Sequence, residues 1–178
     1  MTRDDALEEL KIRLTDKHVF RRSIAVEAIM AELARHYNAD TNIWGLTGLL
    51  HDIDYEKTKN NISSHGSVGA DILDNLDVDQ SIVYSVRAHN DLNGIPRKRK
   101  MDKALYLADI VAESILQYSI TFNKIPSHIE PEHFLSEIKD EGGHLPEGCK
   151  DIELSLEEFV RISLEAIKNS QYCRELFE

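Results

Sequence analysis

The sequence has few of the residues that cross-link a chain or bind metal through sulfur. It contains two cysteines, Cys149 and Cys173, in 178 residues. Two cysteines make neither a disulfide framework nor a sulfur-rich zinc pattern, so we expect two reduced thiols. Long apolar runs are missing as well, and none approaches the roughly 20 residues of a membrane-spanning helix. The N-terminal stretch is acidic, which is not typical of a signal peptide. These features predict a cytoplasmic protein with no membrane partner.

The sequence also has fewer basic than acidic residues. Lys and Arg number 21 against 32 Asp and Glu, which gives a formal net charge of −11. This excess repels phosphate backbones, so we expect no nucleic-acid polymer as a partner. Hydrophobic residues make up 42% and charged residues 30% of the chain. Such a composition is typical of a globular protein, and the length predicts one domain over residues 1–178.

The spacing of apolar residues predicts an all-α fold with no significant sheet. The expected helices cover about residues 2–14, 18–37, 41–52, 65–76, 79–89, 102–119, 132–138 and 155–168. Several of them begin with a capping signal. The signals are capping boxes at Thr2–Asp5 and Ser155–Glu158, and single N-caps at Asp40 or Thr41, at Ser63 or Ser64, and at Asp79. Three of the four prolines fall between residues 121 and 150, which indicates loops around the short helix there.

Polar side chains occur where these helices should present an apolar face. His89 lies on the apolar stripe of its helix, and Asp109 lies on that of the 102–119 helix. His51 and Asp52 end another helix together. A buried carboxylate without a partner is costly, so Asp109 requires a cation, a metal or several donors. Three distant segments thus each direct an imidazole or a carboxylate inward.

Each of these residues also has an ordinary structural explanation. His89 alone fits a hydrogen-bonded core histidine, Asp109 alone fits a pair with an arginine, and the His51–Asp52 dipeptide is common. The combination favours metal binding because a separate explanation is otherwise needed at each position. Imidazole together with carboxylate suits a divalent transition metal such as Mn, Fe, Co, Ni or Zn.

Four blocks of sequence resemble those of the HD-domain superfamily of metal-dependent phosphohydrolases, and in particular its small single-domain members. They are Gly48–Ile53, His65–Ala70, Ala88–Asn90 and Ala104–Asp109, in that order. The resemblance extends over about residues 20–113. It implies an HD-type helical bundle, with an HD core at about 18–119 and a helical extension at about 120–178.

The resemblance also implies which residues hold metal. His51, Asp52 and Asp109 would be ligands of one divalent ion. In the members that hold two ions, His65 and His89 would be ligands of the second ion, with Asp52 bridging the two.

One position departs from the family pattern. The superfamily has an earlier histidine on the helix before the His-Asp pair, and this sequence has Arg22 there. A guanidinium offers no lone pair and cannot be a ligand. His18, one turn earlier, is one candidate replacement. Alternatively, Arg22 clamps a substrate phosphate or pairs with Asp109 while waters complete the site. A third alternative is that Arg22 neutralises the carboxylates and leaves the site inactive.

The implied activity is metal-assisted hydrolysis of a small phosphorylated compound, with a nucleotide as one candidate. Asp52 would orient the attacking water, and Asp54 would be a general base or would support a ligand. Arg97 and Lys98 belong to a basic cluster, residues 97–100, that either attracts an anionic substrate or is a solvated connection. The alternative function is a degenerate HD protein that binds a ligand or partner without catalysis. The oligomeric state stays open, a homodimer included.

Overall fold

The computed structural model describes residues 1–140 and 145–177, and this part of the chain contains helices but no strand. The all-α prediction is therefore confirmed. The helices are α1 (Arg3–Arg13), α2 (Lys17–His36), α3 (Thr41–Leu50), α4 (Tyr55–Thr58), α5 (Ser67–Asn75), α6 (Gln80–Ala88), α7 (Lys100–Thr121), α8 (Pro131–Asp140), α9 (Leu156–Asn169) and α10 (Gln171–Phe177). No described helix is both long and apolar enough to cross a membrane.

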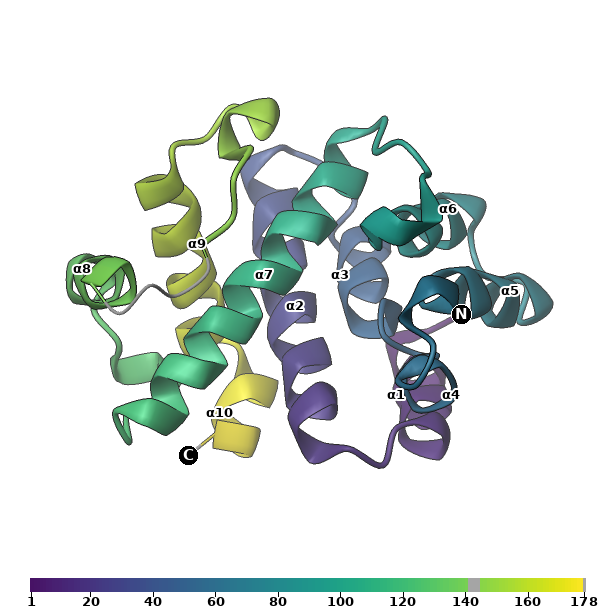
Figure 1. Cartoon of the computed structure of the whole chain (residues 1–178), viewed down its shortest axis with the longest axis horizontal. Helices are drawn as coiled ribbons and strands as arrows, with labels where there is room; N and C mark the ends of the chain where they lie inside the picture. The colour runs from purple at the N-terminus through teal and green to yellow at the C-terminus, as the bar shows by residue number, and fades with distance from the viewer. Residues whose placement is uncertain (141–144, 178) are drawn as a thin grey trace.

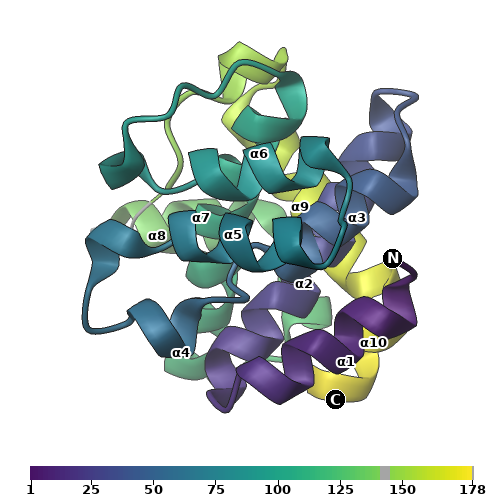
Figure 2. The same cartoon turned by 90° about the vertical axis from the view of Figure 1, so that its right-hand side faces the viewer.

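Helix α2 is the central element of the bundle. It packs against α3, α7 and α9 and also contacts α10. In Figure 1, α7 crosses the middle of the molecule beside α2, with α8 and α9 on one side and α3, α5 and α6 on the other. Figure 2 shows α5 and α6 stacked together on that second side. One buried apolar cluster extends from Ala6 to Cys173.

The predicted capping signals account for the starts of four of the described helices. Thr2 and Ser155 each begin a helix with a complete capping box, and the carboxylates of Asp40 and Asp79 cap α3 and α6. The capping prediction is therefore confirmed at these positions. Helix α7 begins two residues earlier than expected because Asp102, its third residue, accepts hydrogen bonds back from the backbone N–H groups of Lys98 and Arg99.

The prediction for the start of α5 was wrong. The helix expected from residue 65 begins at Ser67, and neither Ser63 nor Ser64 caps it. The two serines lie in a short 3-10 turn, and Gly66 then reverses the backbone with φ of 78°. Such a φ favours glycine because a side chain there is strained. Residue 65 therefore lies outside the helix, where its side chain can turn toward the interior. The short helices α4 and α10 carry weak apolar periodicity and were not predicted.

Close contact between α2 and α3 positions the end of α3. A Cβ atom built on Gly48 would lie 2.6 Å from the carbonyl oxygen of Val26, closer than real contacts allow. The absence of a side chain at residue 48 thus lets the two backbones approach directly. This approach brings the His51–Asp52 pair, which follows α3, against α2.

Candidate metal centre

His51 and Asp52 follow the last turn of α3, and both are fully buried. The Nδ1 of His51 donates a hydrogen bond of 2.8 Å to the carbonyl oxygen of Gly48. This bond directs the Nε2 of His51 toward α7, where it lies 3.2 Å from Oδ1 of Asp109 and 3.3 Å from Oδ2 of Asp52. The three residues offer ligand atoms within 4.8 Å of one another. We call them group one.

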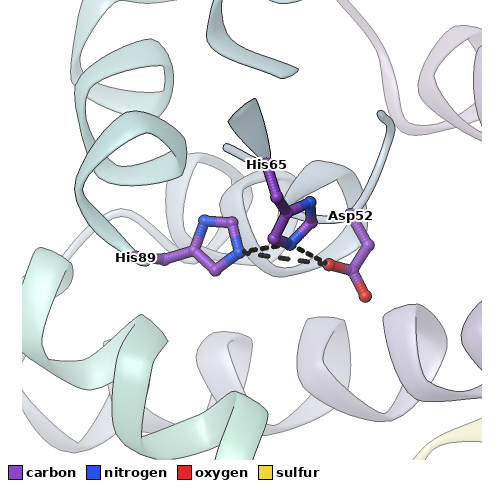
Figure 3. Close-up of side chains that lie close together, drawn as sticks. All are labelled: Asp52, His65 and His89. Carbon is purple, nitrogen blue, oxygen red and sulfur yellow. Dashed lines mark hydrogen bonds and ion pairs between the residues drawn. The ribbon is translucent and has the colours of Figure 1, made fainter. Parts of the chain in front are cut away.

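A second cluster forms around the other oxygen of Asp52. Nε2 of His65 lies 3.1 Å from Oδ1 of Asp52 and 3.1 Å from Nε2 of His89, and Nε2 of His89 lies 4.0 Å from the same oxygen. Figure 3 shows the two rings and the carboxylate converging from different segments. His65 precedes α5 and His89 ends α6. These three ligand atoms also lie within 4.8 Å of one another. We call Asp52, His65 and His89 group two.

The remaining ring nitrogen of each group-two histidine is held by the protein. Nδ1 of His89 donates 2.6 Å to the carbonyl oxygen of Val86. Nδ1 of His65 lies 3.0 Å from Oδ1 of Asp54 and 3.3 Å from the hydroxyl of Thr58. Because Nδ1 of each ring faces these acceptors, Nε2 is the atom directed into group two. Each Nε2 can be a metal ligand when its ring is neutral.

Asp54 lies behind His65. Its Oδ2 accepts hydrogen bonds of 2.9 Å and 2.8 Å from the backbone N–H groups of Gly66 and Gly69, and the residue is fully buried. The carboxylate thus joins the turn before α5 to the ring of His65. Asp54 belongs to neither metal-type group in the described chain.

Arg22 projects from α2 into group one. Its Nη2 donates a short hydrogen bond to Oδ2 of Asp52, and its Nε lies 3.4 Å from Oδ1 of Asp109. Its Nη1 lies 3.4 Å from Oε2 of Glu113, a residue that we did not single out from the sequence. Glu113 is one turn beyond Asp109 on α7, and an i,i+4 relation to a buried acid was the available signal. Nε2 of His18, the other candidate ligand, lies 2.9 Å from Oε2 of Glu113. His18 belongs to neither group.

The charged groups of the centre shift one another's pKa values strongly. Burial alone would lower the pKa of His51, but the negative charges of Asp52 and Asp109 outweigh it and raise that pKa to about 10. For His65 burial is likewise outweighed by contacts with nearby carboxylates, and the pKa rises to about 9. Burial and the positive charges of the other two imidazoles lower the pKa of His89 to about 4. Burial would raise the pKa of Asp52, yet the neighbouring cations hold it well below its usual range. Asp52 is therefore ionised at neutral pH, as a metal ligand must be.

The basic cluster at residues 97–100 makes contacts within the protein. Arg97 donates 3.0 Å to the carbonyl oxygen of His89 and 2.6 Å to Asp91, and its guanidinium lies 3.6 Å over the ring of Tyr106. The Lys98 side chain is exposed. Within the cluster, Arg97 therefore adjoins the centre through the backbone of His89.

The two groups differ in how well they suit a metal ion. In group two, buried Oδ1 of Asp52 lies 3.1 Å from Nε2 of His65, the Nε2 atoms of His65 and His89 lie 3.1 Å apart, and Arg22 contacts the other oxygen of Asp52. This donor set fits a divalent transition metal. In group one, the guanidinium of Arg22 already contacts both carboxylates. Group two fits a metal ion, and group one as it stands does not.

The chain was compared with protein families and with solved structures. A family model described as HD domain matches residues 19–118. A solved structure described as a predicted HD superfamily hydrolase involved in NAD metabolism, from Clostridium acetobutylicum, is 18% identical with a TM-score of 0.47. That alignment covers 93% of this chain and 98% of the other. A structural similarity at this level carries no argument about function. No curated protein matches the sequence.

Proposed function

The chain belongs to the HD-domain family, and from this premise we propose that it is a divalent-metal-dependent phosphohydrolase that acts on a small phosphorylated compound, such as a nucleotide. The observation that carries the proposal is the convergence of one carboxylate oxygen and two imidazole nitrogens in group two. Three protein ligands that leave further coordination positions open are typical of catalytic rather than structural metal sites.

Each residue of the centre would have its own role in this reaction. Asp52, His65 and His89 would hold the ion. When bound, a divalent ion lowers the pKa of water and neutralises charge on phosphate oxygens. Asp52 would also orient the attacking water. Asp54 fixes the ring of His65 and is enclosed by backbone N–H groups, so we assign it a positioning role.

Substrate binding would use the cationic residues around this centre. The side chain of Arg22 is 18% exposed, and three of its contacts are to carboxylates. A guanidinium has five N–H donors, which leaves donors for a phosphate oxygen. Arg97 and Lys98 would attract the rest of an anionic substrate to the same side.

A screen for phosphatase activity tests the proposal. The purified chain would be assayed with nucleoside phosphates and p-nitrophenyl phosphate, with Mn, Co, Ni or Zn added and with excess chelator. We expect turnover that chelator abolishes and added metal restores. His89→Gln should lower the rate more than about tenfold, because second-sphere changes alone cost about 10–100-fold. His133→Gln, which removes a half-exposed histidine outside the centre, is the matched control. Activity that persists in chelator would contradict the proposal.

The second candidate is a degenerate HD protein that binds a ligand without turnover. One observation favours it: Arg22 pairs with the carboxylates of group one and neutralises charge that a second ion would otherwise meet. Under this alternative the protein binds metal or a phosphorylated ligand, but no substrate in the screen is hydrolysed.

A further inference from the structure

The two oxygens of Asp52 face different partners. Oδ2 accepts a hydrogen bond from Arg22 and lies 3.3 Å from His51. Oδ1 faces the rings of His65 and His89, whose Nε2 atoms lie 3.1 Å and 4.0 Å away. One carboxylate therefore separates a half of the centre that contains a guanidinium from a half that contains two imidazoles.

The half around Oδ2 already contains its cation. The guanidinium of Arg22 contacts Asp52, Asp109 and Glu113, so three carboxylates surround one fixed positive charge. The absence of a side chain at Gly48 lets α3 pack directly on the backbone of α2, the helix that carries Arg22. An ion placed in group one would meet a neighbouring cation and would have to displace its hydrogen bond to Asp52.

The half around Oδ1 has the opposite property. The Nδ1 atoms of His65 and His89 face acceptors, so their Nε2 atoms meet at 3.1 Å, and that of His65 lies 3.1 Å from Oδ1 of Asp52. In the metal-free chain a proton on one imidazole lies between these atoms, and a divalent ion can replace it because all three atoms are potential ligands once the rings are neutral. A metal ion at this place would bind the buried Oδ1 and both Nε2 atoms with no guanidinium to displace.

We propose that the chain binds a single divalent ion, in group two, and that the guanidinium of Arg22 permanently occupies the place of a second ion in group one. This inference rests on the metal-binding part of the proposed function. It reassigns Asp109, which the family resemblance would make a ligand, as a partner of Arg22.

Metal stoichiometry and affinity test this arrangement on the full-length chain. Metal-free protein would be titrated with Zn²⁺ and Co²⁺ by calorimetry, and bound metal counted by elemental analysis after dialysis. We expect one ion per chain. His65→Gln should weaken binding at least about tenfold, and the matched variant Asp109→Asn should leave the affinity within about threefold. Arg22→His, which replaces the guanidinium with a potential ligand, should raise the count to two.

The absorption spectrum of bound Co²⁺ gives a second measurement that does not depend on His65→Gln being folded. The spectrum of Asp109→Asn should match that of the unchanged chain, because Asp109 is not a ligand in this arrangement. Two ions per unchanged chain, or a loss of binding in Asp109→Asn with retention in His65→Gln, would overturn the inference. So would the absence of any metal binding.

These outcomes are distinct from those of the activity screen. One bound ion without turnover would leave the metal arrangement intact and remove the proposed hydrolysis. Two bound ions with metal-dependent turnover would do the reverse.

Discussion

Replacement of Gly48 by alanine should separate the two helices on which the centre depends. The added Cβ would lie 2.6 Å from the carbonyl oxygen of Val26, 2.8 Å from its carbonyl carbon and 2.9 Å from the Cα of Glu27. All three atoms are backbone, so no side chain can turn away to make room. Ordinary contact begins at 3.4 Å, and α3 must therefore move by several tenths of an ångström.

The size of the effect follows from two opposing contributions. Alanine favours a helix over glycine by about 1 kcal/mol. Overpacking against a rigid backbone costs about 1–3 kcal/mol and occasionally more. We expect Gly48→Ala to lower the free energy of unfolding by up to about 2 kcal/mol net, which for a chain of this length lowers Tm by up to about 8 °C.

Gly45, one turn earlier in the same helix, provides the matched control. A Cβ atom there would meet only side-chain atoms, 3.8 Å and 3.9 Å away, which is ordinary contact. Gly45→Ala should therefore be neutral or should stabilise the chain by up to about 1 kcal/mol. Thermal and urea unfolding followed by circular dichroism at 222 nm measures both variants. Equal stability of the two variants would refute the close-contact argument.

Two further predictions concern charged groups that hold loops in place. The Glu56 carboxylate binds Lys59 and the backbone and hydroxyl of Thr15, and these contacts lower its pKa to about 2, below the usual 4.5. Because the folded pKa is lowered, Glu56 stabilises the fold above pH 4.5 and this contribution is lost as the pH falls toward 2. Glu56→Gln should thus lower Tm at pH 7, and the difference from the unchanged chain should shrink over that range. Buried Asp102 accepts hydrogen bonds from Arg99, from Ser85 and from the backbone N–H of Lys98. Asp102→Ala should cost about 3 kcal/mol in urea unfolding, whereas Lys98→Ala, which changes an exposed side chain, should cost less than about 0.5 kcal/mol.

Local features of the sequence determined the helices and the composition of the centre. Capping boxes at Thr2 and Ser155 and regular apolar spacing predicted the helices that carry them, because both signals act within one or two turns. The inward position of Asp109 and His89 on apolar stripes indicated a polar centre. The family resemblance added His65 as a candidate ligand. It also identified Arg22 as the residue that departs from the family pattern.

Only the tertiary structure decided which of these side chains contact one another. Oδ2 of Asp52 faces Arg22, while Oδ1 faces two imidazoles. This arrangement depends on the close approach of α3 to α2, which the missing side chain of Gly48 permits. The contact of Glu113 with Arg22 depends on how α7 crosses α2. Periodicity tells which face of a helix a residue occupies, but not which atom of another helix it meets, because that distance is set by packing among segments far apart in the sequence.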